Sequence, residues 1–431
     1  AENLRWYYSA PGRKVDEYDL GSLYNLLGVL YHSQNKPDKA EEYYLAAIEI
    51  QKRLVEKNAD AYEPALAGSY NNTGTFYAVH GQPQKAEKYF RDAIEIYERL
   101  VERNADAYEP YLARSYNNAG NLYYEQGQPD KAEKNYLDAI EIYERLVKNN
   151  ADIYEPDLAV SYNNAGNFYK DQGQPEKAEK YYLAAIGIRE RLVKKNADAY
   201  EPYLARSYNS AGVFYSDQGQ SEKAEEYYLA AIEIQKRLVE KNAEAYESDL
   251  AMGYNNAGVF YSDQGQSEKA EKYYLAAIEI QKRLVEKNAA AYEPDLAMSY
   301  NNAGVFYDDQ NQPDKAEKYY LDAIEIYKRL VKENAAAYEP ELAMSCNNVG
   351  TFYAIQGQPG KAEKYFLAAI EIRERLVKKN AAAYEPDLAA SYISYYLLKE
   401  DKTYLDKAYE IAKRRQDDPR CKTIVEFVES M

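Results

Sequence analysis

The sequence is poor in the residues on which most enzymes and metalloproteins depend. It has two cysteines, two histidines and one tryptophan among 431 residues. Cys346 and Cys421 show no metal-ligand or redox spacing, and two cysteines cannot form a disulfide framework. His32 and His80 belong to no Ser/His/Asp set, and the chain has no phosphate-binding loop and no metal-ligand spacing. We therefore expect no enzyme activity, no cofactor and no metal site.

Basic charge and long apolar runs are scarce as well. There are 54 Lys and Arg against 71 Asp and Glu, a net charge of −17. Nucleic-acid binding needs a basic face, so this balance argues against nucleic acid and against an anionic membrane surface as partners. No apolar run is long enough to span a bilayer, so we expect no membrane insertion. The chain begins at Ala1. This fits a cytoplasmic chain that was trimmed and an extracellular chain that lost a signal peptide, so the location stays open.

The chain consists of one short pattern, repeated. A glycine recurs every 46 residues without insertion or deletion, at Gly28, Gly74, Gly120, Gly166, Gly212, Gly258, Gly304 and Gly350. Fixed periods of this length indicate solenoids or arrays. We predict eight full repeat units over residues 20–386. An N-terminal segment or cap, residues 1–19, precedes them, and residues 387–431 form a degenerate ninth unit and a C-terminal cap helix.

Each repeat unit carries the signals of two helices. In the sixth unit, four residues at spacings i, i+3, i+4 and i+7 lie on one face of a predicted first helix: Tyr254, Ala257, Gly258 and Tyr261. The position of Gly265 is Gly or Asn in all eight units, which is typical of a left-handed helix cap. A second helix opens with proline in most units, as at Pro129. We expect the linker proline, Pro294 here, to start the next first helix.

This pattern resembles the tetratricopeptide repeat (TPR) family, whose motif is W-x2-L-G-x2-Y, then A-x3-F, then P. The sixth unit matches it with Tyr254-x2-Ala257-Gly258-x2-Tyr261, then Ala270-x3-Tyr274. Tyrosine replaces the tryptophan, and Lys or Glu replaces the closing proline, so the second helix can continue. The resemblance covers residues 20 to about 415 and is closest to kinesin-light-chain-like and bacterial members with lengthened units.

The resemblance implies an all-α fold, a right-handed α-solenoid of antiparallel helix pairs whose first helices line a concave groove. It also implies that groove asparagines hold bound peptides, since an amide both donates and accepts hydrogen bonds. The first asparagines of the repeated pair include Asn71, Asn117, Asn163, Asn209, Asn255, Asn301 and Asn347, and the second include Asn118, Asn164, Asn256 and Asn302. Alternatively, one asparagine of each pair hydrogen-bonds the neighbouring repeat and sets the twist. The sequence leaves both roles open.

Two further sets of residues are predicted to face the groove. One position holds Arg114, Arg206, Met252 and Met298 in different units. Another holds Asp171, Asp217, Asp263 and Asp309. These carboxylates occupy the last turn of the first helix, where the helix dipole disfavours them, and such a departure from a local rule hints at function. They would suit a basic or hydroxyl-rich ligand, although a solvated wall in an acidic protein explains them too.

We therefore expect a non-enzymatic scaffold that binds a protein or an extended peptide, with basic peptides among the ligands that suit its groove. A structural subunit that assembles head to tail into a filament is the alternative, because the front and back faces of a repeat array are complementary. The apolar residues predicted for such end-to-end contacts are Trp6, Tyr7, Tyr8, Ile424, Val425, Phe427 and Val428. The competing explanation is that they cap their own end units.

Overall fold

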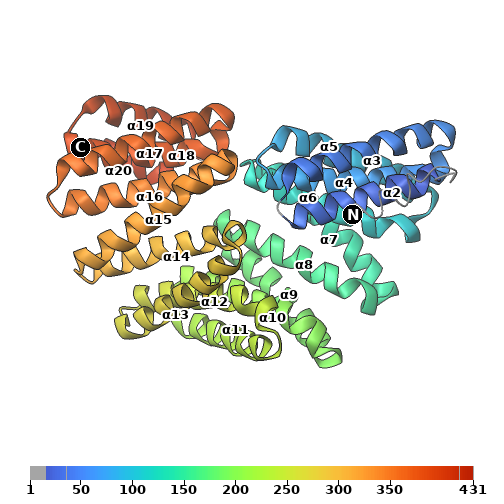
Figure 1. Ribbon diagram of the computed structural model, residues 1–431, viewed down its shortest axis with the longest axis horizontal. Helices are drawn as coiled ribbons and strands as arrows, with labels where there is room; N and C mark the ends of the chain where they lie inside the picture. The colour runs from blue at the N-terminus through green and yellow to red at the C-terminus, as the bar shows by residue number, and fades with distance from the viewer. Residues whose placement is uncertain (1–15, 35, 417, 431) are drawn as a thin grey trace. The chain divides into compact units, whose positions relative to one another are not determined.

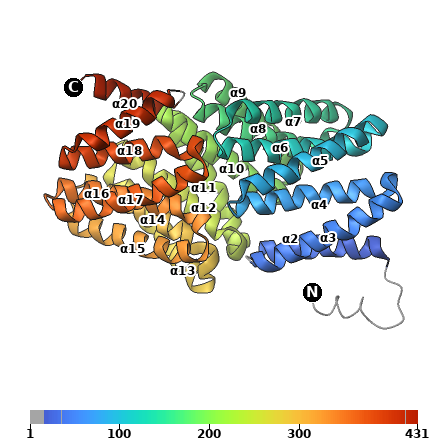
Figure 2. The same cartoon turned by 90° about the horizontal axis from the view of Figure 1, so that it is seen from above.

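The computed structural model describes residues 16–34, 36–416 and 418–430, which form nineteen α-helices and no β-strand (Figure 1). The predicted all-α fold is confirmed. The chain divides into two compact bodies, residues 1–192 and 193–431. Within each body, consecutive helices pack side by side as antiparallel pairs. Figure 2 shows this order in the first body, where α2 and α3 lie at the edge and α4 and α5 follow.

The helices of the full units are of nearly constant length. The first body contains α2 (Glu17–Ser33), α3 (Pro37–Lys57), α4 (Ala59–Val79), α5 (Pro83–Arg103), α6 (Ala105–Glu125), α7 (Pro129–Asn149), α8 (Ala151–Asp171) and most of α9 (Pro175–Lys195). The second body contains α10 (Ala197–Asp217), α11 (Ser221–Lys241), α12 (Ala243–Asp263), α13 (Ser267–Lys287), α14 (Ala289–Asp309), α15 (Pro313–Glu333), α16 (Ala335–Ile355), α17 (Pro359–Lys379), α18 (Ala381–Lys399), α19 (Lys402–Arg414) and α20 (Pro419–Glu429).

A single asparagine joins each second helix to the next first helix. Asn288 donates its N–H to the carbonyl of Leu284 at 2.9 Å, which ends α13, and its side chain accepts from the N–H of Ala291 at 3.3 Å, which begins α14. The helix therefore starts at Ala289, and the prediction that Pro294 starts it is wrong, since Pro294 lies inside α14. The side-chain cap fixes the start of the helix more strongly than the proline does.

The turn between the two helices of a unit follows the sequence prediction. Gly265 has φ +67°, a left-handed conformation that favours glycine, and Asn311 adopts φ +54° at the same position of the next unit. The following second helix begins at proline where the sequence provides one, as in α15 at Pro313. Glycine and proline thus set the turn within each unit.

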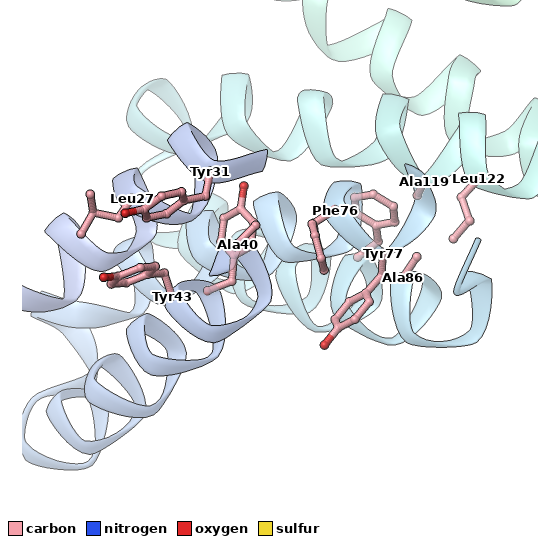
Figure 3. Close-up of a cluster of buried hydrophobic side chains, with 11 residues drawn as sticks. Leu27, Tyr31, Ala40, Tyr43, Phe76, Tyr77, Ala86, Ala119 and Leu122 are labelled. Atoms are coloured by element: carbon pink, nitrogen blue, oxygen red, sulfur yellow. The ribbon is translucent and has the colours of Figure 1, made fainter. Parts of the chain in front are cut away.

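The glycine that marks the period is needed because an aromatic ring lies on it. A Cβ atom built at Gly304 would lie 2.6 Å from Cδ1 of Tyr320, and six of the other seven glycines meet a Tyr or Phe ring at 2.8 Å or less. Figure 3 shows the resulting core of the first body, in which aromatic side chains from α2 to α5 pack with alanines and leucines. The first and second helices of a unit approach each other closely at this contact.

Hydrogen bonds between units explain much of the high tyrosine content. The hydroxyl of Tyr307 in α14 donates to Glu271 of α13 at 2.8 Å, and Lys315 reaches the same carboxylate oxygen at 3.2 Å. The same Tyr–Glu contact recurs at 2.6–2.7 Å in four other units. Burial and the neighbouring carboxylate raise the pKa of Tyr307 well above its usual value. These tyrosines are structural contacts between neighbouring units.

The C-terminal residues proposed for end-to-end assembly are only partly exposed to solvent. Ile424 in α20 is buried, and Val425, Phe427 and Val428 are half-buried, because α20 packs against α18 and α19. Trp6, Tyr7 and Tyr8 lie outside the described residues. At this end of the chain, the apolar side chains cover their own unit. No helix within the described ranges combines the length and the apolar character needed to cross a membrane.

Candidate functional site

The repeated asparagine pair links neighbouring units. The side-chain N–H of the second asparagine donates to the side-chain oxygen of the first asparagine in the preceding unit, over 3.2–3.4 Å, in five places. The donor–acceptor pairs are Asn72–Asn25, Asn118–Asn71, Asn164–Asn117, Asn302–Asn255 and Asn348–Asn301. Each contact therefore joins the second asparagine of one unit, as donor, to the first asparagine of the preceding unit, as acceptor.

Burial separates the two asparagines of a pair. Asn71, Asn117, Asn255 and Asn301 are buried, with Asn255 only 1% exposed. The second asparagines, Asn118, Asn164, Asn256 and Asn302, are half-buried, as are the first asparagines Asn163, Asn209 and Asn347. The four buried residues do not present their amides to a ligand in this structure. The half-buried ones keep part of their surface at the helix face.

The exposed face of the first helices in the second body is apolar. Met252, Val259, Val305 and Met344 are each 36–39% exposed, and Met298 is half-buried. They come from α12, α14 and α16, at two positions of the repeat. Methionine is flexible and makes adaptable contacts. Val259 and Val305 lie two helical turns after Met252 and Met298 on the same helices.

Carboxylates lie at the C-terminal end of the same face. Asp217, Asp263 and Asp309 end α10, α12 and α14 and are exposed. Burial, and then the charges of Asp309 and Asp217, raise the pKa of Asp263 above its usual value. Three carboxylates from consecutive units therefore influence one another. A cation placed among them would relieve this repulsion.

The remaining predicted residues already have protein contacts. Arg206 forms an ion pair with Asp249 of the next unit, at 3.1 and 3.2 Å. Asp171 accepts a hydrogen bond from Tyr124 and lies 3.3 Å from Lys170. Arg114 is exposed and interacts with the hydroxyl of Tyr143 and with the charge of Asp157. Arg206 and Asp171 thus connect neighbouring repeat units.

The two histidines, which occupy different positions of the repeat, meet in the first body. Their ring centroids lie 5.5 Å apart, and both rings pack against Phe76. Nε2 of His80 is buried and has no hydrogen-bond partner in the described structure. Burial lowers the pKa of both imidazoles, and for His80 the charge of His32 lowers it further, whereas Glu41 acts in the opposite direction.

We expect the first body to lose stability as the pH falls below about 6.5, the usual histidine pKa. The unfolded chain binds protons at this pH, whereas the folded state, with its lowered pKa values, resists them, so the free energy of unfolding decreases through this window. Urea midpoints at about pH 7.5 and 5.5 measure the loss. A His32→Ser/His80→Gln variant, with residues that other units carry at these positions, should show a clearly smaller loss. An equal loss in both proteins would contradict the role of the pair.

Among the described residues, no group of three or more His, Cys, Asp or Glu side chains could hold a metal ion. Cys346 and Cys421 are buried and separate. What remains is a surface of exposed apolar side chains beside carboxylates, repeated in consecutive units, that suits contact with another chain.

Family models described as tetratricopeptide repeat match residues 66–145, 157–237 and 249–329, and two further ones match 342–380 and 21–53. No curated protein matches the sequence.

The chain is similar to several solved structures. The apo form of RapI is 16% identical, with a TM-score of 0.50 over 72% of this chain and 99% of RapI. BtubC (BKLC) from P. vanneervenii is 25% identical, with a TM-score of 0.45 over 55% of this chain and 87% of BtubC. A putative kinesin light chain from Podosopora anserina with nearly identical TPR-like repeats is 17% identical, with a TM-score of 0.42 over 52% of this chain and 99% of that one.

Proposed function

Since the chain belongs to the tetratricopeptide repeat family, we propose that it is a non-enzymatic scaffold that binds a basic, partly apolar peptide segment along the exposed face of α10, α12, α14 and α16. Proteins of this family typically mediate protein–protein interactions. The observation that carries the proposal is that exposed apolar side chains and a C-terminal carboxylate lie on the same helix in two consecutive units: Met252, Val259 and Asp263 on α12, and Val305 and Asp309 on α14.

The peptide proposed for this face has apolar side chains alternating with lysine or arginine. Its apolar side chains would cover Met252, Val259 and Val305, and its cations would lie near the carboxylates that now repel one another. Half-buried Asn256 and Asn302 lie on the same helices and can contact the peptide backbone through their remaining surface. Arg114 and Arg206 are not needed for such a ligand.

We expect the Asp217→Asn/Asp263→Asn/Asp309→Asn variant to bind a fluorescent peptide of alternating lysine and leucine about tenfold more weakly at low salt. Three exposed charge contacts of roughly 0.2–1 kcal/mol each are lost. Fluorescence anisotropy measures the dissociation constant, and circular dichroism checks the helix content.

The matched control removes three exposed charges from the second helices, as Glu233→Gln/Glu279→Gln/Glu325→Gln. This variant should keep the affinity within about twofold, since its charges lie on α11, α13 and α15. The proposed function is wrong if both variants weaken binding equally, because net charge alone would then explain it. It is also wrong if the unaltered protein does not bind the peptide.

The alternative function, head-to-tail assembly, is supported by exposed apolar side chains on α2. These are Leu26, Val29 and Leu30, and Leu26 is 64% exposed. Burial of these side chains against another copy would be favourable. Under this alternative, sedimentation velocity should show association that grows with protein concentration and that weakens in Leu26→Asn, the residue of most other units. A monomer at all concentrations would exclude it.

A further inference from the structure

The first body contains a cavity of about 500 Å³ between the first helices of the first three units. Its wall is formed by fifteen residues of α2, α3, α4, α5 and α6. Cavities of this size commonly hold small molecules. The cavity lies apart from the peptide face proposed for the second body, and the inference drawn from it does not depend on that proposal.

The cavity exists because large side chains are missing at two positions of the repeat. Where later units carry Arg, Val or Met, the first two carry Ser22 and Gly68. Where later units carry Tyr, Asp or Glu, the second carries Ala65. All three small residues line the cavity. A Cβ atom at Gly68 would be 3.5 Å from the hydroxyl of Tyr97, so the backbone leaves room for a side chain there.

Two buried polar atoms in the wall have no partner. Gln51 is 2% exposed, and its Oε1 meets no hydrogen-bond donor among the residues described. Ser115 is 1% exposed, and its hydroxyl is likewise unpaired within the described part of the chain. Buried polar atoms without a partner are costly. The wall also holds the half-buried side chains of Ser22 and Asn25, whose oxygen atoms can accept a hydrogen bond from a ligand.

The charge and shape of the wall restrict the ligand further. Among the described lining residues, Arg114 is the only charged one and none is acidic, in a chain of net charge −17. The guanidinium has five N–H donors, so its contacts with Tyr143 and Asp157 leave some for a carboxylate. Tyr97 and Tyr111 stack with centroids 5.8 Å apart, and Tyr111, which is 47% exposed, presents flat apolar surface beside Leu26 and Pro64.

We propose that this cavity binds a small aromatic carboxylic acid whose ring carries a hydroxyl or N–H donor. The ring lies against Tyr111, the carboxylate meets Arg114, and the ring donor reaches the half-buried side chains of Ser22 and Asn25. Binding leaves the ligand chemically unchanged.

Three probes separate these contacts: 4-hydroxyphenylacetate, its neutral amide 4-hydroxyphenylacetamide, and phenylacetate, which lacks the donor. Ligand-observed NMR titrations with the full chain should give a millimolar dissociation constant for 4-hydroxyphenylacetate, as its size allows. Each of the other two should bind about tenfold more weakly, because one charged or hydrogen-bonding contact is lost. Equal affinities of all three probes, or no saturable binding of the first, would overturn the proposal.

The protein variants address the cavity itself. Gly68→Met installs the residue that α12, α14 and α16 carry at this position, so the fold should persist while binding falls at least about tenfold. Gly68→Ala, whose Cβ makes only an ordinary contact, should bind normally. Arg114→Met should lose the preference for the acid over the amide, and the equivalent Arg206→Met should not. Unaltered binding in Gly68→Met, with its helix content intact, would show that the ligand binds elsewhere.

Discussion

Replacing Gly304 with valine is expected to lower the free energy of unfolding of the second body by about 3 kcal/mol. Even the first side-chain atom would lie 2.6–2.9 Å from three ring atoms of Tyr320, which is 3% exposed and enclosed by the core. Overpacking a filled core costs about 1–3 kcal/mol, and the two branches of valine place this variant at the upper end. The better helix propensity of valine offsets only part of the loss.

Urea unfolding followed by circular dichroism measures this loss. Gly360→Val is the matched control, since a Cβ at Gly360 of α17 has no atom within 4 Å. Its stability should change by no more than about 0.5 kcal/mol. If both variants lose stability to the same extent, helix propensity or backbone freedom would explain the glycine, and the ring contact would not.

Replacing Asn255 with alanine is expected to cost about 1–2 kcal/mol, although alanine is the better helix former. Asn255 is 1% exposed, and its removal leaves the side-chain N–H of Asn302 without its acceptor at 3.4 Å. The lost hydrogen bond costs about 0.5–1.5 kcal/mol, and removing the buried side chain of Asn255 also leaves a small cavity. The cost should appear as a lower urea midpoint of the second body.

Asn256→Ala provides the control within the same helix. Asn256 is half-buried, and the corresponding acceptor in the preceding unit, Oδ1 of Asn209, is unpaired in the structure. The substitution should change stability by no more than about 0.5 kcal/mol. Its effect should instead appear in the affinity for the lysine–leucine peptide. An equal loss of stability in both variants would contradict the different roles of the two asparagines.

The elements that depend on local chemistry could be predicted from the sequence. The 46-residue period gives the repetition of the helix pair, and Gly265 and Pro129 give the turn and the start of the second helix. The start of the first helix was misplaced at Pro294. Proline is tolerated within the first turns, whereas the side chain of Asn288 caps the true start.

A bond from one asparagine of each pair to the neighbouring repeat was one of two roles that the sequence left open. The sequence could not decide between them because such contacts depend on how one unit lies on the next. The bond between Asn302 and Asn255 joins residues 47 apart, one more than the period, and engages both members of the pair. The meeting of His32 and His80 also needs the three-dimensional arrangement. The cavity, in contrast, left a signal in the sequence, since Ser22, Ala65 and Gly68 are small where later units carry larger side chains.

A double-mutant cycle on Asn255→Ala and Asn302→Ala measures whether the asparagine pair joins neighbouring repeats. The free energy of unfolding of the second body is measured for the unaltered chain, both single variants and the double variant. We expect a coupling energy of about 0.5–1.5 kcal/mol, because the double variant loses a bond that each single variant already breaks. Additive losses within about 0.3 kcal/mol would contradict this role of the pair.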